Sequence, residues 1–212
     1  MKKIFYFAFL IFILSCITIQ AQEPDTLTKS RWNHDIEAWN YFHPDNSYIF
    51  SPIYGVDKGW LHLEARYNYE ALNTFSAWFG YNFDGGNKFQ YTITPLVGGL
   101  VGDVNGIAPG LELDFNFFGF NFNSTSQYIF DLEGKENDFF YNWTDFIYAP
   151  IDWVWFGISY QRTQLYQNKL DFQYGPMLGG GYKWIGLTAY WYNPGSVDPY
   201  IVLYLSITIP SP

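Results

Sequence analysis

The stretch that decides the fold is Gly59-Trp60-Leu61-His62-Leu63-Glu64-Ala65-Arg66-Tyr67-Asn68-Tyr69-Glu70. Apolar or aromatic side chains occupy every second position from Leu61 to Tyr69, and polar or charged side chains fill the positions between them. A period of two is typical of a β-strand that has one apolar and one polar face. We therefore predict a long amphipathic strand here.

The same alternation recurs along the chain as far as Ile209. A second alternating segment runs from Thr74 to Phe83 and is followed by the turn sequence Asp84-Gly85-Gly86-Asn87, which is typical of a hairpin. Further segments of this kind cover residues 89–94, 111–117, 120–132, 139–149, 153–166, 170–174, 185–191 and 200–209. The pattern predicts an all-β, antiparallel up-and-down barrel of about ten strands, with eight or twelve also compatible.

The composition excludes several other classes. The 212 residues are 23% aromatic and 15% charged, whereas an average soluble domain carries roughly 25% charged residues. Disordered chains lack aromatic residues, and coiled coils are rich in Ala, Glu, Lys and Leu. A helical membrane protein is also disfavoured, because the chain has a single long apolar run, at its N-terminus.

Alternation alone does not say whether the apolar face points to lipid or into a core, since a soluble lipocalin-like barrel shows the same period. Most of the predicted strands reach the ~9–11 residues that a tilted transmembrane strand needs. The polar faces carry too few charges to keep the outside of a barrel in water. We therefore expect a transmembrane β-barrel, with a soluble lipocalin-like binding barrel as an alternative.

The N-terminus resembles a targeting segment. Lys2 and Lys3 precede an apolar run from Ile4 to Ile17, and Ala21 stands before a polar Gln-Glu-Pro sequence. These are the parts of a secretory signal peptide, which we place at residues 1–21. We expect residues 22–58 to form an N-terminal periplasmic extension or plug segment and residues 59–212 to form the barrel.

Cys16 is the single cysteine of the chain. With cleavage near Ala21 it leaves with the signal, so the mature protein has no disulfide, thiol nucleophile or cysteine metal site. The alternative is cleavage before Cys16, because Ile13-Leu14-Ser15-Cys16 loosely resembles a bacterial lipobox and lipidation would then anchor the protein.

Aromatic residues near the predicted strand ends suit the girdles that a membrane barrel places at the two lipid surfaces. These residues are Trp60, Tyr81, Trp153, Trp184 and Tyr200. With the N-terminus in the periplasm, the connections at 71–73, 101–106, 133–137, 167–168 and 194–198 face outward. Outer-membrane lipid is then the main partner of the outer surface.

The polar faces of the strands predict a narrow, polar lumen. Its expected lining residues are His62, Glu64, Arg66, Glu112, Asp114, Gln161, Asp171 and Gln173. One interpretation is a hydrogen-bonded ion network that stabilises a closed, structural barrel. The other is a small porin-like pore or binding cavity that holds or passes small polar solutes and favours cations by charge.

Enzymatic activity is the remaining class. Membrane-barrel hydrolases use a His with a Ser or an Asp, and His62 lies on the same strand face as Glu64. No partner serine is marked by the sequence, so a lipid hydrolase is only an alternative. We expect no catalytic residue, no metal site and no cofactor. Nucleic acid is excluded as a partner, because the net charge is −9 and the arginines are Arg31, Arg66 and Arg162.

The signal-like start, the polar stretch after it and the strands with period two together resemble small Gram-negative outer-membrane β-barrel proteins, including members without an assigned activity. The segments that carry the resemblance are Leu61-His62-Leu63-Glu64-Ala65-Arg66-Tyr67-Asn68-Tyr69, Phe139-Phe140-Tyr141-Asn142-Trp143 and Tyr192-Asn193-Pro194. The resemblance implies a location in the outer membrane and insertion by the barrel-assembly machinery. One departure is the C-terminus, Ile207-Thr208-Ile209-Pro210-Ser211-Pro212, where such barrels usually end in an aromatic residue.

Overall fold

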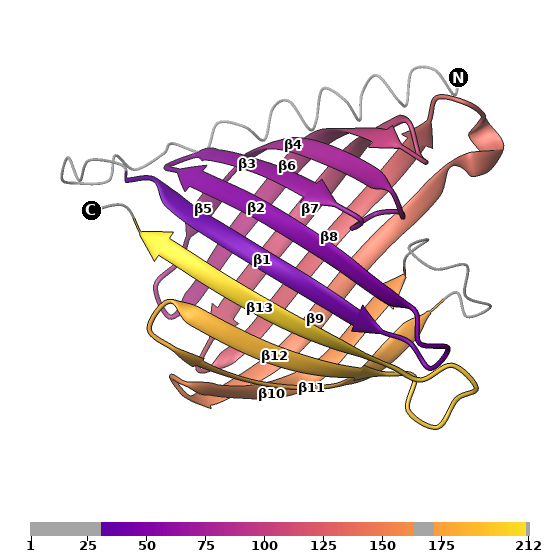
Figure 1. The fold of residues 1–212 in the computed structure, drawn as a ribbon. Coiled ribbons are helices and arrows are strands. Elements are labelled where there is room, and N and C mark those ends of the chain that lie inside the picture. The colour runs from indigo at the N-terminus through magenta and orange to yellow at the C-terminus, as the bar shows by residue number, and fades with distance from the viewer. Residues whose placement is uncertain (1–30, 163–171, 211–212) are drawn as a thin grey trace, which may run out of the picture.

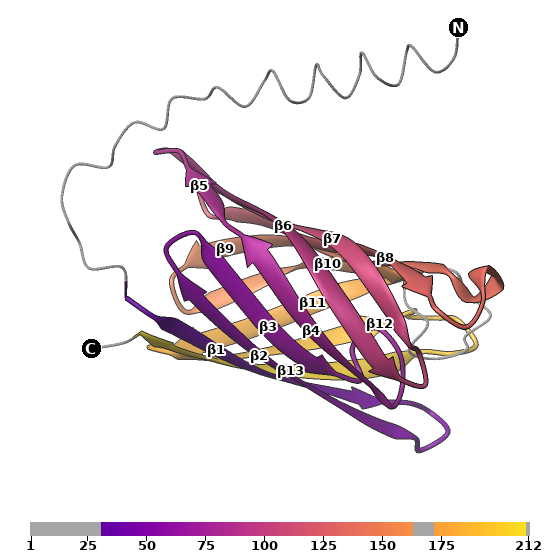
Figure 2. The same cartoon turned by 90° about the horizontal axis from the view of Figure 1, so that it is seen from above.

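The protein is an antiparallel β-barrel (Figures 1 and 2), seen in a computed structural model that describes residues 31–162 and 172–210. A short 3-10 turn, η1 (Lys135–Asn137), lies between β8 and β9. In the described part of the chain, no helix is long and apolar enough to cross a membrane. The strands are β1 (Asn33–Phe42), β2 (Tyr48–Lys58), β3 (Leu61–Tyr67), β4 (Thr74–Tyr81), β5 (Phe83–Gly85), β6 (Phe89–Gly102), β7 (Gly106–Phe117), β8 (Phe120–Asp131), β9 (Phe139–Ile151), β10 (Val154–Arg162), β11 (Gln173–Tyr182), β12 (Ile185–Tyr192) and β13 (Tyr200–Pro210).

Each strand pairs with its neighbours in sequence, and β1 pairs with β13 to close the barrel. Strands β4 and β5 both pair with β6, and Asn82 separates them. They are two parts of one interrupted strand, so the wall has twelve strands. The predicted up-and-down barrel is confirmed, at the highest strand number that the alternation allowed.

The two strands beyond the central estimate of ten come from the segment that we predicted as an extension or plug. That prediction is wrong for residues 33–58, because β1 and β2 are full members of the wall. The alternation is hidden there, because β1 buries Trp39 and Tyr41 inside the barrel while Ile36 and Phe42 are exposed outside, so both faces carry large apolar side chains. Residues 1–30, which include the predicted signal peptide and the alternative lipidation site Cys16, lie outside the described residues.

The two mouths of the barrel differ. Strand β1 begins and β13 ends at the left in Figure 1, and the connections at this terminus-side mouth are short: 59–60, 86–88, 118–119, 152–153 and 183–184. The connection 118–119 is a two-residue hairpin turn with φ of 49° at Phe118 and 80° at Gly119, as a type I′ turn requires.

The opposite, loop-side mouth carries longer connections at 43–47, 68–73, 103–105, 132–138 and 193–199. Short turns face the periplasm in outer-membrane barrels and longer loops face outward. The loop side therefore corresponds to the outward side that the sequence predicted. The predicted outward connection 167–168 lies outside the described residues.

The outer wall of the barrel is apolar. Large side chains along the strands are about half exposed, among them Phe79, Val97, Ile107, Phe120, Phe146, Ile158, Leu178, Leu187 and Ile201. A water-soluble monomer rarely exposes so large a continuous apolar surface, and a lipocalin-like barrel points this face inward. The protein is a membrane β-barrel with its apolar side chains toward lipid.

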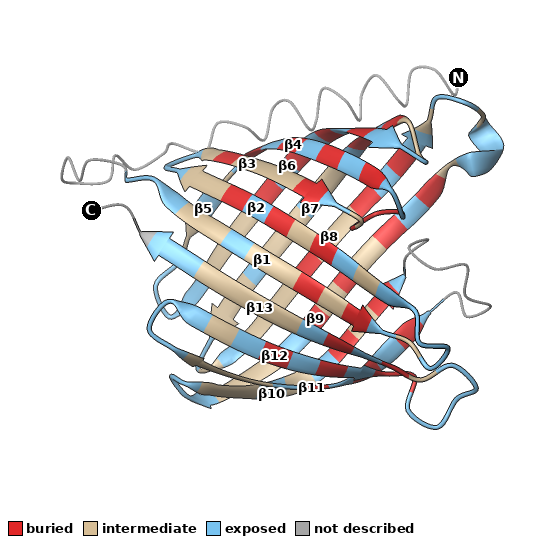
Figure 3. Ribbon diagram, viewed as in Figure 1, coloured by how far each residue is buried: buried red, intermediate tan, exposed pale blue. Residues whose placement is uncertain are grey.

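The loop-side half of the lumen is filled. Figure 3 shows the buried residues gathered in this half of the barrel. Aromatic side chains from opposite walls meet there, with ring centroids 5.0 Å apart for Tyr69 and Tyr141 and 4.6 Å apart for Trp39 and Trp143. We call this cluster the aromatic plug; it consists of Trp39, Tyr41, Tyr69, Tyr141, Trp143, Tyr190 and Tyr192, each at most 6% exposed.

Candidate functional site

A cavity of about 600 Å³ occupies the lumen from the aromatic plug toward the terminus-side mouth. Its volume lies in the range of ~300–1,000 Å³ that is typical of small-molecule sites. The lining comes from nearly every strand, because inward positions alternate with outward ones around the whole barrel. The cavity is a polar cup under an aromatic ceiling.

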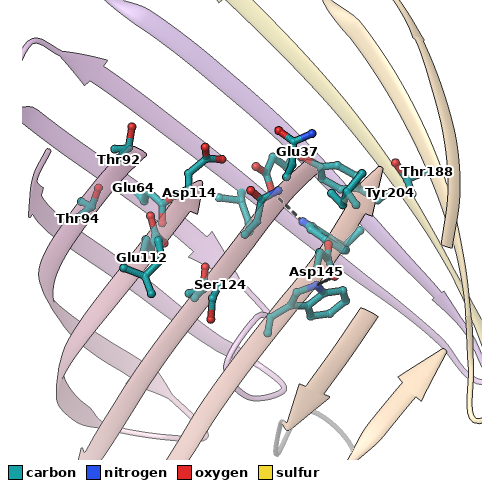
Figure 4. A pocket seen from close by; sticks show the side chains of 18 of the residues that line it. Glu37, Glu64, Thr92, Thr94, Glu112, Asp114, Ser124, Asp145, Thr188 and Tyr204 are labelled. Carbon is teal, nitrogen blue, oxygen red and sulfur yellow. Dashed lines mark hydrogen bonds between the residues drawn. The ribbon is translucent and has the colours of Figure 1, made fainter. Parts of the chain in front are cut away.

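The lining is strongly acidic. Two basic side chains, Arg66 and His62, face the cavity, and no lysine is among the described residues that line it. Six carboxylates line it: Glu37, Asp57, Glu64, Glu112, Asp114 and Asp145. In Figure 4, Glu64 lies beside Glu112, while Glu37 and Asp145 lie apart from this pair.

Arg66 is held on the β3 wall by three carboxylates. Its Nε donates to Glu64 Oε2 at 2.5 Å, Nη2 donates to Glu112 Oε1 at 2.7 Å, and Nη1 donates to Glu70 Oε1 at 3.2 Å. The guanidinium also lies over the rings of Tyr69 and Trp78, 4.9 and 5.0 Å from their centroids. With 2% exposure, Arg66 is a buried, fully engaged cation.

His62 lies on the same strand, on the terminus side of Arg66. Its Nδ1 is 2.9 Å from Asp57 Oδ1 on β2, and Asn82 Nδ2 donates to the same oxygen at 2.6 Å. Thr94 Oγ1 in turn donates to Asn82 Oδ1 at 2.6 Å. The other ring nitrogen, Nε2, is 3.4 Å from Glu64 Oε1 and 3.6 Å from Glu112 Oε2. It is buried and makes no hydrogen bond of acceptable geometry.

A second pair of carboxylates is held by indole groups. Trp39 Nε1 donates to Glu37 Oε2 and Trp143 Nε1 donates to Asp145 Oδ1, both at 2.9 Å. Asp145 also accepts from the Ser159 hydroxyl and, at 3.1 Å, from the Tyr190 hydroxyl. The tryptophans that form the ceiling of the cavity therefore also orient its acidic groups.

The structure brings five of the eight predicted lumen residues to this cavity: His62, Glu64, Arg66, Glu112 and Asp114. Gln161 and Gln173 are inside the barrel but buried beside the plug, where Gln161 Nε2 donates to Gln173 Oε1 at 3.1 Å. Asp171 lies outside the described residues.

Three lining carboxylates were missed by the sequence. Glu37 and Asp57 belong to the segment that was predicted as an extension. The polar signal is weak there, because the inward face of β1 carries Trp39 and Tyr41 as well as Glu37. Asp145 lies in β9, whose inward face also carries Phe139, Tyr141 and Trp143 and so lacks a polar signal.

Of the predicted girdle residues, Trp60, Tyr81, Trp153 and Trp184 are 42–62% exposed at the terminus-side mouth. Their contact with lipid headgroups stays a prediction. Tyr200 was placed wrongly: it is 2% exposed, faces the lumen and hydrogen-bonds with Gln161 and Gln173. It pairs with the buried Tyr192, and alternation then turns Ile201 outward.

The site offers no support for the hydrolase alternative. Among the described residues, the His62 ring nitrogens form ion pairs with the carboxylates of Asp57, Glu64 and Glu112, and no hydrogen bond from His62 to a serine is present. Ser159, a buried hydroxyl inside the barrel, binds Asp145 and Tyr192.

No protein-family model matches the chain, and no curated protein matches its sequence. Solved structures match its fold. The KdgM porin is 11% identical, with a TM-score of 0.56 over 82% of this chain and 98% of the porin. The KdgM porin in complex with disordered oligogalacturonate is 12% identical, with a TM-score of 0.55 over the same shares. The outer membrane protein Omp33 of Acinetobacter baumannii is 10% identical, with a TM-score of 0.47 over 85% of this chain and all of Omp33. The chain thus has the fold of an outer-membrane porin barrel.

Proposed function

We propose that this protein is a narrow outer-membrane barrel that binds and passes small cations and small cationic solutes, with its loop side closed in the present state. The observation that carries this function is the lining of the cavity, where six carboxylates face one guanidinium and one imidazole. Rings of Asp and Glu select cations in narrow pores, because the low-dielectric wall strengthens their attraction.

The charge of the lumen also argues against carrying over the ligand of the KdgM complex. Each unit of an oligogalacturonate bears a carboxylate, and a polyanion would meet a surplus of like charge in this cavity. The shared fold therefore supports a solute barrel, while the lining residues of this chain support the opposite charge preference.

Passage through the barrel requires the aromatic plug to move. Tyr41, Tyr141 and Tyr192 are at most 1% exposed, so among the described residues the plug blocks the way from the cavity to the loop side. The second candidate function, a purely structural barrel, rests on this same plug, because its ring contacts tie opposite walls together. The two functions differ in whether removing part of the plug gives a selective pore.

Single-channel recording in planar bilayers separates them. Tyr141→Ala deletes an inward ring from the plug, and Phe140→Ala deletes the adjacent outward ring, which is 40% exposed. For a solute barrel, wild type and Phe140→Ala open rarely, Tyr141→Ala increases the open time at least tenfold, and the reversal potential in a KCl gradient indicates cation preference. Adding Glu112→Gln to Tyr141→Ala reduces that preference. A folded Tyr141→Ala barrel that is silent or prefers chloride overturns the proposal.

A further inference from the structure

We propose that His62, Glu64 and Glu112 form a binding site for one divalent transition metal ion of the Zn²⁺ class. The sequence predicted no metal site, but the barrel brings His62 and Glu64 of β3 together with Glu112, which reaches into the same cavity from β7. One ligand atom from each lies within 4.8 Å of the other two. The inference does not depend on conduction, since a metal can bind in a barrel that never opens.

The two distances from the imidazole nitrogen to the carboxylates match a tetrahedral metal better than a direct hydrogen bond. Metal–nitrogen and metal–oxygen bonds to zinc are ~2.0–2.2 Å, so neighbouring ligand atoms of a tetrahedral site are about 3.3–3.6 Å apart. His62 Nε2 lies 3.4 Å from Glu64 Oε1 and 3.6 Å from Glu112 Oε2. A protonated Nε2 would instead approach one carboxylate oxygen to ~2.7–2.9 Å.

The carboxylates present one free oxygen each. Arg66 takes Glu64 Oε2 and Glu112 Oε1, which leaves Glu64 Oε1 and Glu112 Oε2 toward the imidazole. Arg66 thus fixes both side chains as single-oxygen ligands. Its role in the site is that of a positioning residue.

His62 is prepared for the ligand role from the opposite side of its ring. It is 7% exposed, and Asp57 Oδ1 accepts from its Nδ1, which directs the lone pair of Nε2 at the two carboxylates. Metal-binding histidines almost always donate their second ring N–H to a carboxylate, a carbonyl or water in this way. Asn82 and Thr94 continue the chain of hydrogen bonds and hold Asp57.

The local charge also favours the binding of a cation. Asp57, Glu64, Glu70 and Glu112 surround Arg66 and His62. With neutral His62, these groups carry a surplus of negative charge in a largely buried region, and like charges in such a region repel strongly. A divalent ion offsets most of this surplus, leaving a fourth coordination position directed into the cavity for water or a solute group.

The nitrogen ligand and the small number of protein ligands select the class of metal. Imidazole suits Zn²⁺, Cu²⁺, Fe²⁺ and Ni²⁺, whereas Ca²⁺ takes six to eight oxygens and Mg²⁺ keeps its octahedral waters. The competing interpretation is an imidazolium that satisfies the carboxylates without any metal. It predicts no saturable binding of zinc.

The test is zinc titration of the full-length refolded barrel in detergent, without a histidine tag, by calorimetry. We expect one Zn²⁺ per barrel, a loss of affinity of at least 100-fold in His62→Gln and Glu112→Gln, and a ~10–100-fold loss in Asp57→Asn, as for other residues that orient a ligand. Ca²⁺ and Mg²⁺ are not expected to compete. The matched control is the double variant His34→Gln with His43→Gln, which removes the other histidines and leaves binding unchanged.

A second readout keeps the test independent of the folding of the variants. Wild-type barrel loaded with Co²⁺ is expected to show the intense visible absorption of tetrahedral cobalt, and Zn²⁺ is expected to abolish it. Heat-modifiable mobility on gels reports whether each variant is folded. The site is overturned if wild type binds no zinc saturably, if binding is lost in the histidine control, or if a folded Glu112→Gln barrel binds as tightly as wild type.

Discussion

The indole rings of Trp39 on β1 and Trp143 on β9 meet edge to face at a centroid distance of 4.6 Å, from opposite sides of the barrel. Each indole also donates to a cavity carboxylate on its own strand, Glu37 or Asp145. This contact separates the filled half of the lumen from the acidic cavity. The same contact thus forms the ceiling of the cavity and contributes to the stability of the barrel.

Trp39→Ala is therefore expected to lower the free energy of unfolding by about 3–5 kcal/mol, the usual cost of deleting a large buried aromatic side chain. The measurement is urea unfolding in lipid vesicles. Trp191→Ala is the control, because Trp191 is 53% exposed on the outer wall. Equal losses in the two variants would contradict the role of the Trp39 contact.

Arg66→Met is expected to destabilise the barrel by about 3–5 kcal/mol, because it leaves the carboxylates of Glu64, Glu70 and Glu112 buried without their cation. Adding Glu70→Gln is expected to restore part of the loss, since one uncompensated charge is then removed. A double-mutant cycle measured by urea unfolding checks this coupling. Strictly additive effects would show that Arg66 and Glu70 act independently.

Neighbouring glycines in β6 give a sharp packing test. A Cβ at Gly98 would lie 2.4 Å from Cδ2 of the Trp78 ring, whereas nothing lies within 4 Å of a Cβ at Gly99. Gly98→Ala is expected to cost ~1–3 kcal/mol through overpacking, and Gly99→Ala to change stability by less than ~0.5 kcal/mol. The melting temperatures of the two variants check that Gly98 faces the lumen and Gly99 faces outward. A larger loss in Gly99→Ala than in Gly98→Ala would contradict this orientation.

The orientation in the membrane can be measured by thiol labelling, because Cys16 is the single cysteine in the sequence. Val197, 90% exposed, lies in a loop-side connection, and Lys88 is exposed in a terminus-side turn. On intact cells, a membrane-impermeant maleimide is expected to label Val197→Cys, and to label Lys88→Cys only after the outer membrane is permeabilised. The reverse labelling pattern would show that the barrel has the opposite orientation in the membrane.

Acid is expected to weaken the loop-side mouth through His43, which lies in the 43–47 connection and stacks on Tyr200. Burial lowers the pKa of His43 below its usual value, against the opposing charges of Asp45 and Asp198. Because the folded pKa is depressed, the stabilisation is present above the unfolded pKa of about 6.5 and is lost as the pH falls through the folded pKa. His43→Gln is expected to flatten the decline in unfolding free energy that begins as the pH falls below about 6.5. His34→Gln is expected to leave that decline unchanged.

The sequence predicted the wall of the barrel wherever the two faces of a strand differ in polarity. The segment from Leu61 to Tyr67 is the clearest case, since its lumen face carries His62, Glu64 and Arg66. Strands β1 and β9 carry aromatic residues inside as well as outside, because their inward positions supply part of the aromatic plug. There the alternation of polarity vanishes, and β1 was missed although its geometry is ordinary.

The site was predictable in its chemistry but not in its geometry. Alternation placed Glu64, Arg66 and Glu112 in the lumen, which the structure shows as direct partners. It gave no means of knowing that β2 supplies Asp57 to the far side of the His62 ring, because that contact depends on the pairing of two strands. Nor does a period of two show that Tyr200 faces inward. Alternation says that Tyr200 and Ile201 lie on opposite faces, but it does not say which of the two faces the lumen.

Closure by β1 and β13 has a consequence for how the protein is made. Ten residue pairs, from Asn33 with Pro210 to Phe42 with Ile201, join the two ends of the folded chain. Until the last strand arrives, β1 and β12 are both open edges that no lipid can satisfy. Contacts of such long sequence separation form slowly. Closure of this barrel therefore depends on its final strand, because a chain that ends before residue 200 lacks the whole closing partner of β1.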